Sequence, residues 1–257
     1  VDALAEAARQ NATRDPALWR RLYWRVEAGR LERAEGEAAR RARFLLATTR
    51  FDAEALPAGT VAIAIGAHVG PPPPRERDPL VVFTGRLGYR PNAVAAELLL
   101  REIWPPVRAS VPRAELVVGG ADAPPALRRL AAATLGARLL SPVPDMRALL
   151  ATARVAAVPV DMGTGTPIKV YEALEAGCAV VATPAAASRA VLDGRAAPLR
   201  TASGPTAFAR EVASLLADEG SAAALGEAGR AFVVAHADRH VLALRLASLL
   251  LSAAEGA

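Results

Sequence analysis

Short apolar runs alternate with longer amphipathic segments over most of the chain. The apolar runs, rich in Val, Leu and Ala, predict strands at Leu80–Phe83, Glu115–Val118, Ala137–Leu140, Val155–Val160 and Ala179–Ala182. The segments between them predict helices near 93–103, 125–134, 146–152 and 167–176. Apolar strands that alternate with helices are typical of a parallel sheet covered on both faces. We therefore predict a Rossmann-like α/β domain from residue 80 onward.

The flanking segments follow other patterns. Three more helices are predicted near 205–217, 221–235 and 238–253. At the other end, one long charged helix is predicted over 14–42, followed by two short strands that flank a small helix, Phe44–Ala47 and Val61–Ile65. Four consecutive prolines at 71–74 cannot continue a helix or a sheet, and indicate a linker.

These patterns predict four parts. Residues 1–66 carry only two strands, too few for an independent core, so we interpret them as the remainder of an N-terminal α/β domain. Residues 67–79 form the proline-rich linker, 80–235 the Rossmann-like domain and 236–257 a C-terminal helix.

Composition narrows the function classes. Apolar residues make up 53% of the 257 residues, as in a globular protein. The net charge is +5, but the basic residues, all Arg except Lys169, are spread along the chain among acids, which argues against nucleic-acid binding. The longest apolar run, near Val241–Ala254, is interrupted by Arg245 and is too short to span a bilayer. With one cysteine and no signal-peptide pattern, we expect a cytoplasmic protein.

A turn rich in glycine follows the strand predicted at Val155–Val160. It contains Gly163, Thr164, Gly165 and Thr166, and leads into the helix predicted at 167–176. Thr166 suits the N-cap and Pro167 the first helical position, while Gly177 suits the position after the helix. The free N–H groups and dipole of such a helix start attract anions, and glycines let a diphosphate approach the backbone.

Two charged residues in this helix suit a sugar nucleotide. Lys169, in the first turn, can place a positive charge at the phosphates. Glu172, one turn later, can accept hydrogen bonds from both ribose hydroxyls. The alternative is a tight strand–helix turn of structural importance only, with Lys169 and Glu172 as solvated i,i+3 partners. The three histidines show no metal-ligand spacing with a Cys or carboxylate cluster.

The run GTGTPIKVYEALEAGCAVVATP resembles the signature of family 4 glycosyltransferases of the GT-B fold. Its usual form ends in E-A-x-A-x-G-x-P-V-V-A-T, and Ala179 replaces the proline here. The arrangement of Gly165, Lys169 and Glu172 is closest to a subgroup associated with exopolysaccharide assembly. The family commonly has a glutamate eight residues before the ribose-binding one, where this chain has Thr164.

Further segments are similar to the same family. VVFTGRLGYRPN resembles the strand and Gly-Arg-Leu turn from which Arg86, beside Gly85, would bind the donor diphosphate. Arg90 is a candidate for a second cation there, although a plain surface role is an equal alternative. LVVGG resembles the turn beside the nucleotide, with Gly119 and Gly120. The loop Ser141–Asp145 resembles the base-contacting loop, which would use backbone groups around Val143.

The resemblance implies a retaining glycosyl transfer that needs neither metal nor cofactor, with a nucleoside-diphosphate sugar as donor substrate. Arg86, Lys169 and the amides from Gly165 to Ile168 would stabilise the leaving diphosphate. The acceptor would be a saccharide or a lipid-linked one, the latter with peripheral membrane association. The family's N-terminal acceptor domain is mostly lacking from this sequence, so we expect a longer enzyme or a partner chain. The alternatives are a non-catalytic nucleotide-sugar binding module and, less favoured, a sugar-nucleotide epimerase.

Overall fold

A computed structural model describes residues 3–42, 45–63, 69–71, 74, 76–162, 167–192 and 194–255, without the side chains of residues 14, 239–241 and 253–255. The chain divides into two compact units. Unit one contains Val1–Gly66, Met162–Thr166 and Arg239–Ala257, and unit two contains Ala67–Asp161 and Pro167–Asp238. Residues 67–79, predicted as a linker, group with unit two.

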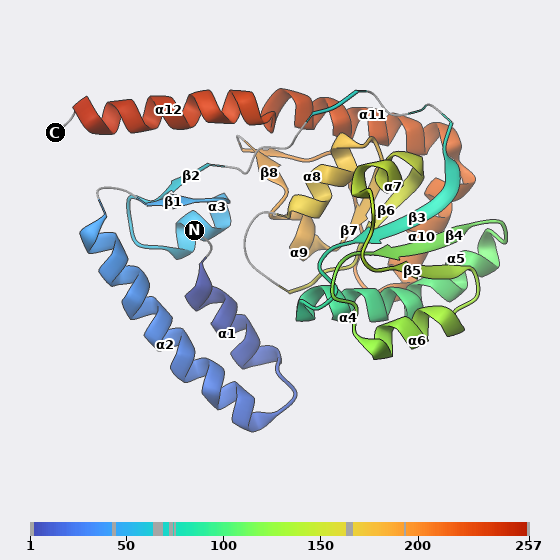
Figure 1. Cartoon of the computed structure of the whole chain (residues 1–257), viewed down its shortest axis with the longest axis horizontal. Helices are drawn as coiled ribbons and strands as arrows, with labels where there is room; N and C mark the ends of the chain where they lie inside the picture. Colours follow the sequence, from blue (N-terminus) through green and yellow to red (C-terminus); the bar gives the residue numbers. More distant parts are fainter. Residues whose placement is uncertain are drawn as a thin grey trace. The chain divides into compact units, whose positions relative to one another are not determined.

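Unit one is mainly helical (Figure 1). Its elements are α1 (Leu4–Arg14), α2 (Leu18–Arg41), β1 (Leu46–Ala47), α3 (Arg50–Ala55), β2 (Val61–Ala62) and α12 (Arg239–Glu255). The two strands flank α3, as the sequence predicts, and they pair in parallel. The helix predicted over 14–42 is confirmed as α2, although it begins four residues later, at Leu18, and α1 before it was not predicted. The chain turns between α1 and α2. The buried Asp15 makes this turn by accepting a 3.0 Å hydrogen bond from the amide of Ala17, and Pro16 follows it.

Unit two is built on a six-stranded sheet that confirms the predicted α/β class. The strands are β3 (Asp78–Thr84), β4 (Glu115–Gly119), β5 (Ala137–Leu140), β6 (Ala153–Val158), β7 (Ala179–Ala182) and β10 (Arg200–Thr201). They are all parallel, in the order β10-β7-β6-β3-β4-β5. Every residue of β6 and β7 is buried, which explains why these strands are apolar except for Arg154 in β6.

Helices cover both faces of this sheet (Figure 1). One face carries α4 (Arg90–Leu98), the π-helical turn η1 (Leu99–Ile103), α5 (Trp104–Ser110), α6 (Pro125–Ala133) and α10 (Pro205–Ala217). The other face carries α7 (Met146–Thr152), α8 (Ile168–Glu175) and α11 (Glu219–His236). The short elements α9 (Pro184–Ala187), β8 (Val191–Leu192) and β9 (Arg195–Ala196) follow β7.

Several predicted bounds in unit two need correction. The helix predicted near 93–103 begins at Arg90 and continues through η1 and α5 to Ser110. Pro105 and Pro106 fit because they lie in the first turn of α5, after the wider π turn, where helical N–H groups need no partner. His236, expected at the start of the last helix, is instead the last residue of α11. The two-residue strand β10 was not predicted, since it is too short to show a pattern.

The strand order defines a switch point at the carboxyl edge of the sheet. The chain leaves β3 toward β4 over one face and later enters β6, on the other side of β3, over the opposite face. Crossovers that diverge in this way leave a crevice at the carboxyl ends of the two central strands, where open α/β sheets bind ligands. Gly85 follows β3 at this edge, and the glycine-rich turn follows β6.

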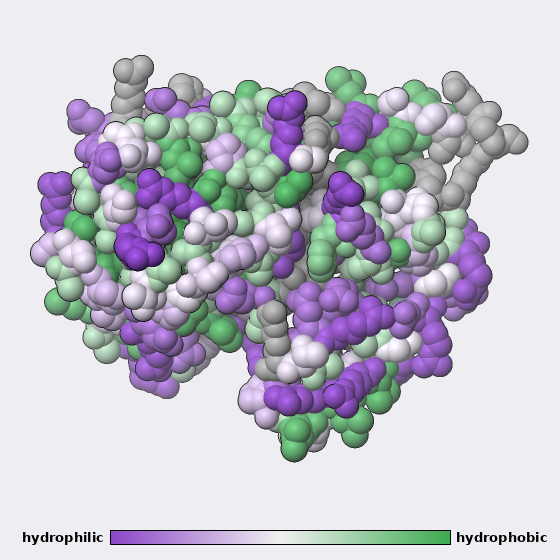
Figure 2. All heavy atoms as spheres, turned by 180° about the vertical axis from the view of Figure 1, so that it is seen from behind, coloured by the Kyte–Doolittle hydropathy of each residue, from purple (hydrophilic) through white to green (hydrophobic). Residues whose placement is uncertain are grey.

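The surface of unit one carries exposed apolar side chains on α2. Leu18, Leu22 and Val26 are 77%, 63% and 59% exposed. Figure 2 shows hydrophobic side chains at the end of the α1–α2 hairpin, beside strongly hydrophilic ones. None of the described helices is both long and apolar enough to cross a membrane.

Candidate functional site

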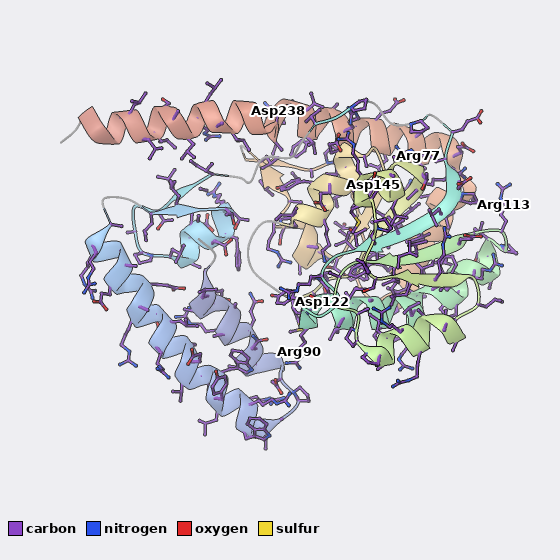
Figure 3. All side chains as sticks on the ribbon, in the orientation of Figure 1. Arg77, Arg90, Arg113, Asp122, Asp145 and Asp238 are labelled. Atoms are coloured by element: carbon purple, nitrogen blue, oxygen red, sulfur yellow. The ribbon has the colours of Figure 1, made fainter. Side chains whose placement is uncertain are left out.

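The predicted site residues that the structure describes follow the carboxyl ends of β3, β4, β5 and β6. Figure 3 places Arg90 and Asp122 at this edge of unit two, and Arg77 and Arg113 at the opposite edge. Parallel strands bring these ends together although their sequences lie far apart. The carboxyl edge therefore gathers the segments that the sequence singles out.

Two glycines form the floor of this edge by close backbone contact. Gly85 has φ +150° and Gly120 has φ +157°. A Cβ atom on Gly120 would lie 1.7 Å from the carbonyl oxygen of Gly85, which no side chain can tolerate. The amide of Gly85 also donates to the carbonyl of Gly119 at 3.0 Å. Glycine at 120 thus lets the turns after β3 and β4 touch.

Gly119 serves a second contact, with the loop after β5. A Cβ atom on Gly119 would lie 2.9 Å from a methyl group of Val143. The same loop is tied to the turn after β4 by Ser141, whose hydroxyl oxygen accepts from the amide of Ala123 at 3.2 Å. The structure therefore brings Val143 to the edge where the sequence predicts it.

Arg86 points toward the turn after β4. Its Nε donates to the Asp122 carboxylate at 2.7 Å, and the two side chains are 74% and 55% exposed. Asp122 has φ +60°, a left-handed conformation that Asp tolerates better than most residues. An exposed ion pair of this kind is weak, so that Arg86 can exchange Asp122 for a bound anion.

The helix α8 is fixed at both ends. Pro167, predicted as its first residue, is instead its N-cap, one position earlier. At the other end, Gly177 has φ +72°, its amide donates to Leu174 O at 2.9 Å, and the amide of Cys178 donates to Ala173 O at 2.9 Å. This Schellman motif confirms Gly177 as the residue that ends the helix.

Thr183, the last residue of the signature, anchors the chain before the glycine-rich turn. It is buried, and its hydroxyl donates to the carbonyl of Val160 at 2.7 Å. Its amide donates to Val158 O at 3.3 Å. The threonine thus holds the end of β6 against the end of β7.

Lys169 is the most enclosed charge at this edge. Its ammonium group donates to the side-chain oxygen of Asn92 on α4 and lies 4.9 Å from the centre of the Phe83 ring. The side chain is half-buried, so the alternative of a fully solvated lysine does not describe it. Burial lowers the pKa of Lys169 to about 8, an effect that Glu172 opposes and Arg189 reinforces.

Glu172 lies one turn after Lys169, at the rim. Its side chain is exposed, whereas the residues on either side of it, Tyr171 and Ala173, face the core. Partial burial of the carboxyl raises its pKa, and Lys169 opposes the rise. Glu172 therefore offers hydrogen-bond acceptors beside the most enclosed cation of the edge.

Five predicted site residues remain: the four of the glycine-rich turn, and Arg90. Gly163, Thr164, Gly165 and Thr166 lie outside the described residues, so the predicted phosphate turn stays a prediction. Arg90 is exposed, at the first position of α4.

Three residues of this edge were missed in the sequence. Asn92 contacts Lys169, Asp122 contacts Arg86, and Arg189 lies close enough to affect the pKa of Lys169. Only Asn92 carried a usable signal, as a polar residue in the first turn of a helix that starts at a strand's carboxyl end. The partners of Asp122 and Arg189 depend on contacts between distant segments.

This arrangement suits an anionic ligand with hydroxyl groups. It combines an enclosed ammonium, an exchangeable guanidinium, glycine turns without side chains and a carboxylate one helical turn away. A separate cavity of about 440 Å³ lies at the other end of β6, lined by residues that include Arg77, Arg154 and Glu219. Within the described part of the chain, no group of three or more His, Cys, Asp or Glu side chains is placed to hold a metal ion.

Solved structures of several glycosyltransferases share this fold. TarM of S. aureus matches with a TM-score of 0.71 and 13% identity, over 86% of this chain and 46% of TarM. HepE of Anabaena matches with a TM-score of 0.69 and 17% identity, over 86% of this chain and 67% of HepE. Sucrose-phosphate synthase from Thermosynechococcus elongatus matches with a TM-score of 0.66 and 20% identity, over 84% of this chain and 59% of the synthase.

The chain thus has the fold of GT-B glycosyltransferase structures, as the sequence resemblance implies, and spans about half the length of TarM. Curated protein sequences give no match. The family model described as "Glycosyl transferases group 1" matches residues 78–218, more than half of the 257 residues and most of unit two. The chain therefore belongs to the group 1 glycosyl transferase family.

Proposed function

We propose that unit two binds the nucleoside-diphosphate part of a sugar donor and that the protein transfers the sugar with retention of configuration. The observation that carries this proposal is the enclosed Lys169 ammonium beside Gly85 and Asn92, at the switch point of the sheet. A half-buried cation that is held by a neutral amide suits a ligand that brings its own negative charge.

Each residue then has a separate task. Lys169 and Arg86 bind the diphosphate and stabilise the charge that grows on it as the glycosidic bond breaks. Glu172 accepts hydrogen bonds from the ribose hydroxyls. The backbone of Gly119, Gly120 and Val143 bounds the space for the base, and the glycine-rich turn from Gly163 supplies amides to the phosphates.

The finer assignment concerns donor and acceptor. The solved structures of TarM and HepE contain UDP, which makes a uridine nucleotide the first donor to test. The acceptor that we propose is a saccharide or a lipid-linked saccharide. The sequence signature favours a family 4 enzyme of polysaccharide or exopolysaccharide assembly.

Calorimetric titration with UDP, GDP and inorganic diphosphate tests the donor site. We expect one of the nucleotides to bind more tightly than inorganic diphosphate. Glu172→Gln should weaken nucleotide binding about tenfold, the effect of one or two lost hydrogen bonds to a charged acceptor, and leave inorganic diphosphate unaffected. Lys169→Met should weaken the binding of both the nucleotide and inorganic diphosphate.

Two outcomes would contradict the proposal. Absence of binding of every nucleoside diphosphate would exclude a donor site, whatever the acceptor. Equal losses of nucleotide and inorganic diphosphate in Glu172→Gln would exclude the ribose role. The Glu97→Gln variant, on an exposed part of α4, is the matched control and should bind like the wild type.

A further inference from the structure

The bond between Lys169 and Asn92 joins the two helices that begin at the switch point. Lys169 lies in the first turn of α8 and Asn92 in the first turn of α4, on opposite faces of the sheet. The ammonium group donates to the amide oxygen of Asn92 over the ring of Phe83 on β3. The cation is thus held by a neutral partner.

Asn92 makes a second bond that fixes its orientation. Its side-chain nitrogen donates to the carbonyl oxygen of Arg86 at 2.9 Å. A flipped amide would turn its NH₂ group toward the ammonium and its oxygen toward the carbonyl, and both contacts would be repulsive. Asn92 therefore connects Lys169 with the backbone of the residue that also carries the second proposed phosphate-binding cation.

The hydrogen bond between Lys169 and Asn92 lies in a closely packed part of the site. Asn92 is 8% exposed. A Cβ atom on Gly85 would lie 2.9 Å from the Asn92 amide nitrogen and 3.0 Å from the Lys169 ammonium. A side chain at position 85 would therefore displace the bridge.

We propose that Asn92 is a positioning residue of the donor site, which holds the Lys169 ammonium at the switch point without neutralising it. This inference rests on the proposed donor-binding function of the same edge. A carboxylate at position 92 would hold the ammonium equally well, but it would cancel the charge that the diphosphate needs. An apolar residue at position 92 would leave Lys169 charged, but it would no longer hold the lysine side chain in place.

The groups around Lys169 set its pKa. Glu172 on its own helix favours the charged form, while burial and Arg189, which follows α9, disfavour it. The pKa of about 8 is the balance of these effects. From α4, Asn92 adds a neutral acceptor, and from β3, Phe83 adds the face of its ring, both of which favour the ammonium.

Because Lys169 is the only lysine, its titration can be observed directly. Incorporation of ¹³C-labelled lysine gives one side-chain NMR signal, followed from pH 6 to 11. Asn92→Asp should raise the pKa of Lys169 by about one unit or more, since it adds an opposite charge in contact. Asn92→Leu should lower it. Aspartate is well tolerated in the first turn of a helix, so Asn92→Asp keeps the test valid if Asn92→Leu does not fold.

Titration with UDP at pH 7 tests the effect of the Asn92 substitutions on ligand binding. Asn92→Asp should weaken UDP binding at least tenfold, although Lys169 stays charged. The control is Asn11→Asp on α1, the same substitution at the other asparagine of the chain, which should bind UDP like the wild type. A pKa of Lys169 that is unchanged in both Asn92 variants would overturn the inference.

The two proposals fail in distinguishable ways. If the wild type binds no nucleotide, the donor function fails, and the NMR titration still decides whether Asn92 controls Lys169. If the wild type binds UDP and Asn92→Asp binds it equally well, the positioning role alone is wrong.

Discussion

Glu175 and Arg230 form a buried ion pair in which a guanidinium nitrogen lies 2.9 Å from the carboxylate, with the side chains 7% and 16% exposed. The same carboxylate oxygen accepts from Arg147 at 3.0 Å and from the amide of Gly70 at 2.9 Å. One side chain at the end of α8 thus joins α7, α11 and the segment before β3. The helix that presents Lys169 is held at its far end by this cluster.

Removal of the carboxylate should destabilise unit two strongly. Glu175→Ala leaves two arginines without their buried partner, and we expect a loss of about 3–5 kcal/mol in the free energy of unfolding. Urea unfolding measures it. Glu97→Ala, which breaks the exposed pair with Arg101, should cost less than about 1 kcal/mol. Similar urea midpoints for these two variants would show that the cluster adds no stability.

Gly85→Ala should weaken nucleotide binding. The added methyl group would displace Asn92 and Lys169, and φ +150° is unfavourable for alanine. Gly204→Ala is the matched control, because Gly204 has φ +77° and open space around it. Calorimetry should show UDP binding at least about tenfold weaker in Gly85→Ala and unchanged in Gly204→Ala. Equal effects would mean that backbone strain, rather than the displaced lysine, lowers the affinity.

Asp122→Asn should strengthen diphosphate binding. Asparagine keeps the left-handed conformation at φ +60°, but it releases Arg86 from the ion pair and removes a negative charge from the edge. We expect about a two- to tenfold gain in UDP affinity at low salt, from an exposed charge interaction of this size, and a smaller gain at high salt. Arg86→Leu should lose affinity. Unchanged binding in both variants would remove Arg86 from the site.

Lys169→Met should stabilise the protein without ligand at neutral pH. The folded-state pKa of about 8 lies below the ordinary value near 10.4, so below pH 8 the folded protein holds a partly desolvated ammonium at a cost. We expect a gain of about 1–2 kcal/mol at pH 7. The cost is relieved as the pH rises from 8 to 10.4, because the unfolded chain then binds more protons than the folded one.

Urea unfolding of wild type and Lys169→Met at several pH values tests whether Lys169 lowers the free energy of unfolding at neutral pH. The difference between the two should shrink from pH 8 to pH 10, while contributions from other groups cancel. A variant that is less stable at pH 7 would show that the contacts with Asn92 and Phe83 outweigh the desolvation of Lys169.

Local patterns predicted most of unit two. The strands at Ala137–Leu140 and Ala179–Ala182 have the predicted bounds. Ala179–Ala182 is buried and apolar along its whole length, as expected of a strand covered on both faces. The helix end at Gly177 was equally readable, since a left-handed residue after a helix favours glycine. The helix α1 was not predicted, and the helix predicted over 14–42 begins instead at Leu18, after the turn at Asp15.

The candidate site was likewise predicted only in part from local sequence patterns. The sequence by itself determined the fold class, the glycine turns and the candidate roles of Arg86, Lys169 and Glu172, because these follow from short segments next to strand ends. Only the tertiary structure decided that Asn92 holds Lys169 and that Asp122 pairs with Arg86. These partners lie 77 and 36 residues apart and meet because parallel strands bring their carboxyl ends to one edge, a placement that no local pattern records.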